Sequence, residues 1–251
     1  MQLVILTALG VGGATVAGAL LGFLFKKIPH KLNDGILGFA AGVMLAAAVT
    51  GLILPAAELT GTRRIYIVVL GIFTGALFLN FMDQLTPHLH HISGIEPEAH
   101  RDNRALDRVL LFVLAIAIHN LPEGLAAGVG FGGEDNSSAI TVAVGIALQN
   151  IPEGMVIISP MLAAGIRPGR TFLIAAATGL VEVIGTMTGY FAASISAAVL
   201  PFMLAFAGGT MLYVISDEMI PETHAHGYER LATYSLLIGF TVMLVLDSAI
   251  G

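Results

Sequence analysis

Long apolar runs dominate the chain, and short polar stretches separate them. A membrane-spanning helix needs about 20 mostly apolar residues, and eight segments of the chain meet this length. They lie at roughly 3–25, 33–54, 65–83, 108–131, 138–164, 170–195, 199–221 and 231–250. We therefore predict an all-α integral membrane protein, in which residues 1–251 form a single transmembrane domain of eight helices.

The composition agrees with this pattern. Hydrophobic residues make up 56% of the chain, charged residues make up 11%, and the mean hydropathy is +0.88. Soluble domains carry about 25% charged residues, so this chain has too little polar surface to cover a water-facing globule. The net charge of −6, without a basic tract, argues against nucleic-acid binding. The absence of cysteine excludes disulfides, iron–sulfur clusters and thiolate metal ligands.

Basic residues predict the orientation of the helices. The first apolar segment has no basic residue before it, and Lys26 and Lys27 follow it, the reverse of a cleavable secretion signal. Arg63 and Arg64 fall in one set of loops or at its edges. The other set holds Lys26, Lys27, Lys31, Arg101, Arg104, Arg108, Arg167, Arg170 and Arg230. Basic loops stay in the cytoplasm, so we expect both termini to lie outside it.

A polar motif occurs twice, near the middle of two successive predicted helices. His119–Gly124 reads HNLPEG, and Gln149–Gly154 reads QNIPEG, 30 residues later. In each copy the first polar residue and the glutamate, Glu123 or Glu153, are four positions apart and share a helix face. The intervening asparagine, Asn120 or Asn150, lies about 100° around the helix and can serve a neighbouring site.

Glu182 stands near the middle of the sixth predicted helix, so three glutamates, with Glu123 and Glu153, lie near the bilayer centre. A charged side chain there costs about 2.5–3.5 kcal/mol on insertion scales. Every lysine and arginine lies in a predicted loop or at a helix end, so ion pairing does not offset this cost. The carboxylates must be protonated, share protons or hold a cation. With His119 and amide oxygens beside them, a bound metal ion is the simplest explanation.

Further residues are weaker candidates. Met44 could add a thioether ligand, although a methionine in this position is more often part of an apolar core. Acids and histidines near the end of the seventh helix could form a metal exit path, or a solvated helix end; they are Asp217, Glu218, His224 and His226. Candidate gate residues are Asn80, Asp83 and Glu58.

The longest predicted loop, at about 84–107, is expected to be flexible and cytoplasmic. It holds four histidines, which are His88, His90, His91 and His100. Histidine binds metals transiently near neutral pH, so we expect these residues to collect or sense metal without being essential for transport.

The sequence resembles the ZIP (Zrt/Irt-like) family of divalent metal transporters, and most of all its bacterial GufA-like branch. The features that carry this resemblance are His119–Gly124, Gln149–Gly154, Glu182, Asp217–Glu218 and Pro221–His224. A pair of such motifs on consecutive membrane helices is highly specific, and the resemblance covers the whole chain.

The resemblance implies an eight-helix fold with a binuclear metal site between helices four, five and six. One metal would be bound by His119, Glu123, Gln149 and Glu153, with Met44 as a further ligand. The other would be bound by Asn120, Asn150 and Glu182 together with the two shared glutamates. The family also implies a homodimer in the inner membrane of a bacterium. Transport would run toward the cytoplasm, by movement of helices one, four, five and six.

We therefore expect a carrier of Zn²⁺, with Cd²⁺, Fe²⁺ or Mn²⁺ as competing substrates, because nitrogen and oxygen ligands suit all of these ions. Gln149 and Asp217 stand where some relatives have histidine, which leaves the preferred metal open. No organic cofactor and no partner beyond metal ions, lipid and a second copy of the chain are expected. One alternative is a proton-coupled exporter. Another is an intramembrane metalloenzyme, which lacks support because His-Glu-x-x-His is absent and the midplane glutamates look committed as ligands.

Overall fold

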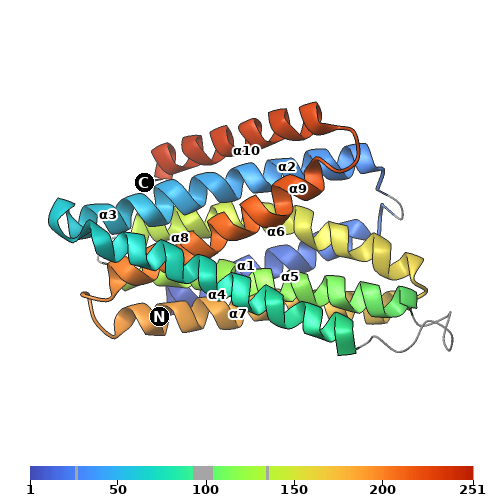
Figure 1. Ribbon diagram of the computed structural model, residues 1–251, viewed down its shortest axis with the longest axis horizontal. Helices are drawn as coiled ribbons and strands as arrows, with labels where there is room; N and C mark the ends of the chain where they lie inside the picture. The colour runs from blue at the N-terminus through green and yellow to red at the C-terminus, as the bar shows by residue number, and fades with distance from the viewer. Residues whose placement is uncertain (26–27, 93–103, 134–135, 251) are drawn as a thin grey trace.

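The computed structural model describes residues 1–25, 28–92, 104–133 and 136–250, and in these ranges the secondary structure is entirely helical (Figure 1). Long helices lie side by side along the long axis, and both termini lie in the same half of the view (Figure 1). The helices are α1 (Gln2–Gly22), α2 (His30–Ala46), α3 (Leu54–Thr60), α4 (Ile65–Ile92), α5 (Arg104–Val129), α6 (Asn136–Ala163), α7 (Pro168–Ser194), α8 (Leu200–Val214), α9 (Ile220–Thr223) and α10 (Glu229–Ile250).

Two of these rods contain a π-helical turn. The turn η1 (Ala47–Ile53) joins α2 to α3, and η4 (Ile215–Met219) joins α8 to α9. Each set forms one continuous helical rod, His30–Thr60 or Leu200–Thr223. In both rods a proline, Pro55 or Pro221, follows two residues after the turn. Proline lacks an N–H and its ring crowds the carbonyl four residues earlier. A wider turn relieves this crowding, and such turns are frequent at functional sites.

Seven rods in the described ranges are long and apolar enough to cross a membrane. They confirm an all-α membrane protein, whereas the prediction that α5 adds an eighth span stays a prediction. The predicted loop at 84–107 is wrong at both edges, because α4 continues to Ile92 and α5 begins at Arg104. Hydropathy locates the apolar layer, but a helix can continue into water beyond it. Residues 93–103 of that predicted loop lie outside the described residues.

The rods form two bundles. In the first bundle α1 packs along α6 and α7, and α5 packs along α7; in the second, α2 packs along α10 and α4 along α8. Glycines bring the backbones within each bundle into contact. A Cβ atom added to Gly12 would collide with the carbonyl of Gly179 in α7, and one added to Gly42 would collide with that of Leu236 in α10. Small residues allow this close packing where lipid removes the hydrophobic driving force between helices.

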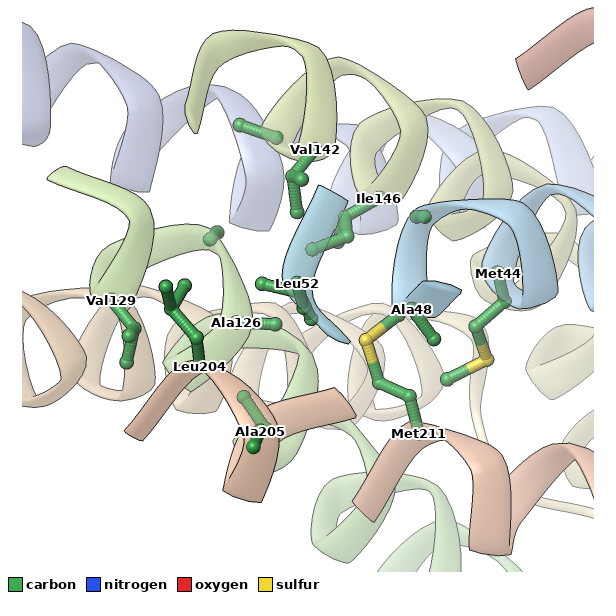
Figure 2. Close-up of a cluster of buried hydrophobic side chains, with 14 of the residues drawn as sticks. Met44, Ala48, Leu52, Ala126, Val129, Val142, Ile146, Leu204, Ala205 and Met211 are labelled. Atoms are coloured by element: carbon green, nitrogen blue, oxygen red, sulfur yellow. The ribbon is translucent and has the colours of Figure 1, made fainter. Parts of the chain in front are cut away.

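Apolar side chains fill the space between the bundles at one end. Leu52 of η1 is fully buried and lies in one cluster with Val142 and Ile146 of α6 (Figure 2). The same region contains Ala126 and Val129 of α5 and Leu204, Ala205 and Met211 of α8 (Figure 2). We call this cluster the apolar seal. It lies toward the end of the molecule at which α3 ends at Thr60 and α5 ends at Val129.

Candidate metal site

The repeated motif places its polar side chains inside the first bundle, on facing stretches of α5 and α6. Glu123 and Gln149 are each 2% exposed, and Asn120 and Asn150 are completely buried. Glu153 is half-buried. Pro122 and Pro152 lie within their helices and do not end them. The structure thus brings both copies of the motif to one cavity.

Three buried oxygens of the motif have no hydrogen-bond partner among the described residues. They are Oδ1 of Asn120, Oε2 of Glu123 and Oε1 of Gln149. Nearly all buried polar groups in proteins are hydrogen-bonded, so three such oxygens from two neighbouring helices call for an explanation. A cation satisfies acceptor oxygens that no donor reaches. Amide and carboxylate oxygens are suitable ligands for a divalent ion.

Glu182 of α7 faces the same region but is held by hydrogen bonds. Its Oε1 accepts from Asn120 Nδ2 at 2.6 Å and from Thr15 Oγ1 at 2.5 Å, and its Oε2 accepts from Asn150 Nδ2 at 2.5 Å. The side chain is completely buried. Neither Glu182 nor the two motif glutamates pairs with a lysine or arginine in the part of the chain that the structure describes.

A cavity of about 600 Å³ leads from the motif toward the end opposite the apolar seal. His119, Glu123, Gln149 and Glu153 line its inner part, and Asn33, near the start of α2, lines it too. The remaining polar lining comes from the second bundle and includes Asp217, Glu218 and Glu222. The polar site is therefore accessible from one end of the molecule and closed by apolar side chains at the other.

One close polar contact crosses this cavity between the bundles. Nε2 of His119 on α5 lies 2.7 Å from Oε1 of Glu218 on η4. Among the described residues no group of three or more histidine, aspartate or glutamate side chains is close enough to hold one ion. A bound metal ion would therefore need amide oxygens as further ligands, or the His119 side chain would have to move away from Glu218 to bind it.

The other candidates of the seventh predicted helix separate in space. Asp217 is exposed and lines the cavity. The His224 ring folds back onto its own helix, with Nδ1 2.9 Å from the carbonyl oxygen of Ile220. The His226 ring stacks on His30, with ring centroids 4.3 Å apart, and its Nδ1 lies 3.0 Å from Oδ1 of the buried Asp34.

Among the remaining candidates, those with described side chains do not line the cavity. Met44 is 1% exposed and belongs to the apolar cluster, where Figure 2 draws it with Met211. Glu58 is exposed on α3, at the sealed end. Asn80 donates to the hydroxyl of Tyr213 at 2.8 Å and so joins α4 to α8. Asp83, His88, His90 and His91 lie within α4, and His100 lies outside the described residues.

Two residues at these sites were missed from the sequence. Asp34 is an acid near the start of the apolar helix α2 and is completely buried, so the argument applied to Glu182 would have identified it. Thr15 stands alone between small apolar residues of α1, and no spacing pattern marks it as a neighbour of Glu182.

Comparison with known proteins agrees with this arrangement. The family model described as ZIP Zinc transporter matches residues 96–247. The chain is 41% identical to zinc transporter GufA of Myxococcus xanthus, over 98% of each protein. It is 41% identical to zinc transporter ZIPB of Bordetella bronchiseptica, over 95% of this chain and 78% of that protein. It is 32% identical to human zinc transporter ZIP11, over 95% of this chain and 94% of that protein.

The chain belongs to the ZIP family, and its bacterial relatives at this identity confirm the predicted bacterial branch. These relatives are named transporters, which confirms the prediction that the protein is not an enzyme and removes the metalloenzyme alternative.

Proposed function

We propose that the protein carries zinc ions across a membrane toward the cytoplasm, through a site formed by His119, Glu123, Gln149 and Glu153. The observation that supports this most is a set of buried oxygens that have no hydrogen-bond partner among the described residues, which belong to Asn120, Glu123 and Gln149. They stand at the inner end of the cavity, two of them on residues that line it. The names of the relatives favour zinc as the ion.

Release of the ion would follow the acidic side of the cavity. Glu218 competes with the metal for His119, because the two side chains already lie 2.7 Å apart. Asp217 and Glu222 then offer carboxylate oxygens farther along the cavity wall. Oxygen ligands exchange ions readily compared with thiolates, which this chain lacks. The path therefore combines ligands strong enough to bind zinc and weak enough to release it.

Alternating access requires that the site face each side of the membrane in turn. The first bundle carries the motif side chains, and the second bundle supplies Glu218 together with Leu52 of the seal. Backbone contacts tie the helices within each bundle, whereas side chains fill the boundary, for example between Gly51 and Val142. We propose that the first bundle moves as a unit past the second, which would open the seal and close the cavity.

Finer features of the proposal rest on the family resemblance. Glu123 and Glu153 would bridge two adjacent ions, since paired metal sites lie about 3.5–4 Å apart, a span that one carboxylate can bridge. Cd²⁺, Fe²⁺ and Mn²⁺ would compete with Zn²⁺. The carrier would act as a homodimer in the inner membrane of a bacterium, with both termini outside the cytoplasm.

Uptake of radioactive zinc by proteoliposomes, with and without a pH gradient, tests the proposal. We expect accumulation above that of protein-free liposomes without any organic substrate. Equal counts in both preparations, with correctly folded protein, would contradict it. If a proton gradient drives loss of preloaded zinc, and zinc is not taken up when the gradient is reversed, the result would support export instead.

A further inference from the structure

Thr15 of α1 makes a hydrogen bond unlike those of other buried threonines in the protein. The hydroxyls of Thr178 and Thr210 donate to carbonyls three residues earlier in their own helices. This local bond is the usual solution for a threonine inside a helix. The Thr15 hydroxyl instead donates to Oε1 of Glu182 on α7, at 2.5 Å. A donor aimed at a buried carboxylate in another helix indicates a role in placing that carboxylate.

Backbone contacts fix the position of Thr15. A Cβ atom on Gly154 of α6 would collide with the backbone carbonyl of Thr15. Gly12, one turn earlier in α1, meets Gly179 of α7 in the same way. The hydroxyl therefore stands on a backbone that α6 and α7 hold from two sides. Such support is what keeps a functional side chain in its productive geometry.

Glu182 uses most of its acceptor capacity in this arrangement. A carboxylate has about four lone-pair positions. Thr15 and Asn120 both bond to Oε1, and Asn150 bonds to Oε2. One position on Oε2 is left to face a cation. Because a carboxylate only accepts, both asparagines must turn their Nδ2 atoms toward it, which directs Oδ1 of each the other way.

We propose that Thr15 is a positioning residue of the metal site, which orients Glu182 and, through it, the amide groups of Asn120 and Asn150. The bonds of Glu182 join all four helices of the first bundle through one carboxylate. Oδ1 of Asn120 is thereby held in a buried place without a donor, ready to ligate a cation. This inference rests on the proposed function as a zinc carrier and adds a residue of α1 to its site.

Calorimetric titration of the purified full-length protein with zinc chloride tests the proposal. The variant T15V keeps the shape of the side chain and removes the donor. Loss of a group that orients a metal ligand weakens metal binding by about tenfold or more. We expect a loss of this size for T15V, and rescue to within about twofold of wild type by T15S, which restores the hydroxyl. The control is T178V, which removes a buried hydroxyl of the same bundle that bonds only within its own helix.

The control separates positioning from general stability. T178V is expected to lower the midpoint of thermal unfolding while zinc affinity stays the same. Wild-type affinity in a folded T15V would overturn the inference, as would an equal loss of affinity in T178V. A T15V protein that does not fold while T178V does would assign Thr15 a purely structural role and overturn it too. A wild-type protein that binds no zinc would instead contradict the proposed function itself.

Discussion

His119 and Glu218 meet across the boundary between the two bundles, with 2.7 Å between Nε2 and Oε1. His119 belongs to the proposed metal site, and Glu218 belongs to the π-helical turn η4 on the opposite wall of the cavity. The pair therefore connects the proposed site to the proposed release path, and it joins the first bundle to the second in this arrangement.

Replacement of Glu218 tests this connection. In E218Q the side chain keeps its size but loses the charge that competes with zinc for His119. We expect zinc uptake by proteoliposomes to slow several-fold, while zinc affinity in detergent rises, because the Glu218 carboxylate no longer competes with zinc for His119. E229Q, which removes an exposed acid at the start of α10, serves as the control. Loss of zinc binding in E218Q as severe as in H119A would show that Glu218 is itself a ligand.

Two adjacent glycines of α1 test the close packing of the first bundle. A Cβ atom at Gly12 would strike the Gly179 carbonyl, whereas one at Gly13 has nothing within 4 Å. Overpacking costs about 1–3 kcal/mol, so G12A should lower the midpoint of thermal unfolding. G13A should leave this midpoint unchanged or raise it slightly, because alanine favours the helix. Equal midpoints for the two variants would contradict the close contact of α1 with α7.

The four histidines between the third and fourth predicted spans are predicted to adjust the rate and not to carry the ion across. Replacement of His88, His90, His91 and His100 together by alanine should leave substantial zinc uptake, since none of them is part of the proposed midplane site. The comparison is made at equal expression. Complete loss of uptake by a folded variant would give these histidines an essential role.

The orientation of the chain can be tested by labelling. Cysteine is absent from the chain, so S137C and N103C each introduce one reactive thiol. The bias of basic residues predicts that S137C reacts with an impermeant reagent from outside intact cells, while N103C reacts only after permeabilisation. Labelling of both positions from the same side would exclude the proposed topology.

Much of this architecture can be predicted from hydropathy and from the free-energy cost of burying a charged side chain. Seven predicted spans have their counterparts, and both copies of the motif lie together because apolar helices place them at similar depth. Helix ends were less predictable. The second predicted span ended at about 54 and the seventh at about 221, whereas the helical segments continue to Thr60 and Thr223. Likewise α4 continues past Asp83, because polar residues remain helical outside the apolar layer.

The partners of individual side chains were the least predictable feature of the site. Spacing within one helix places His119 and Glu123 on one face, but it carries no information about a neighbouring helix. The contact of His119 with Glu218 and the hydrogen bond from Thr15 to Glu182 join segments that are distant in sequence. Met44 is a further example, because its position in the sequence is compatible with a metal ligand and with a core residue. In the structure its side chain lies in the apolar core.

The central claim is that zinc is held between α5 and α6 by Glu123 and Glu153, and counting bound zinc tests it most directly. Zinc per protomer is measured on purified wild type, E123A, E153A and E182A, and uptake is measured on the same preparations. We predict two ions in wild type, one in E182A, and neither retained binding nor uptake in E123A or E153A. Saturation of wild type at one ion would remove the second ion from the proposal. Full zinc binding and uptake in folded E123A and E153A would contradict the account.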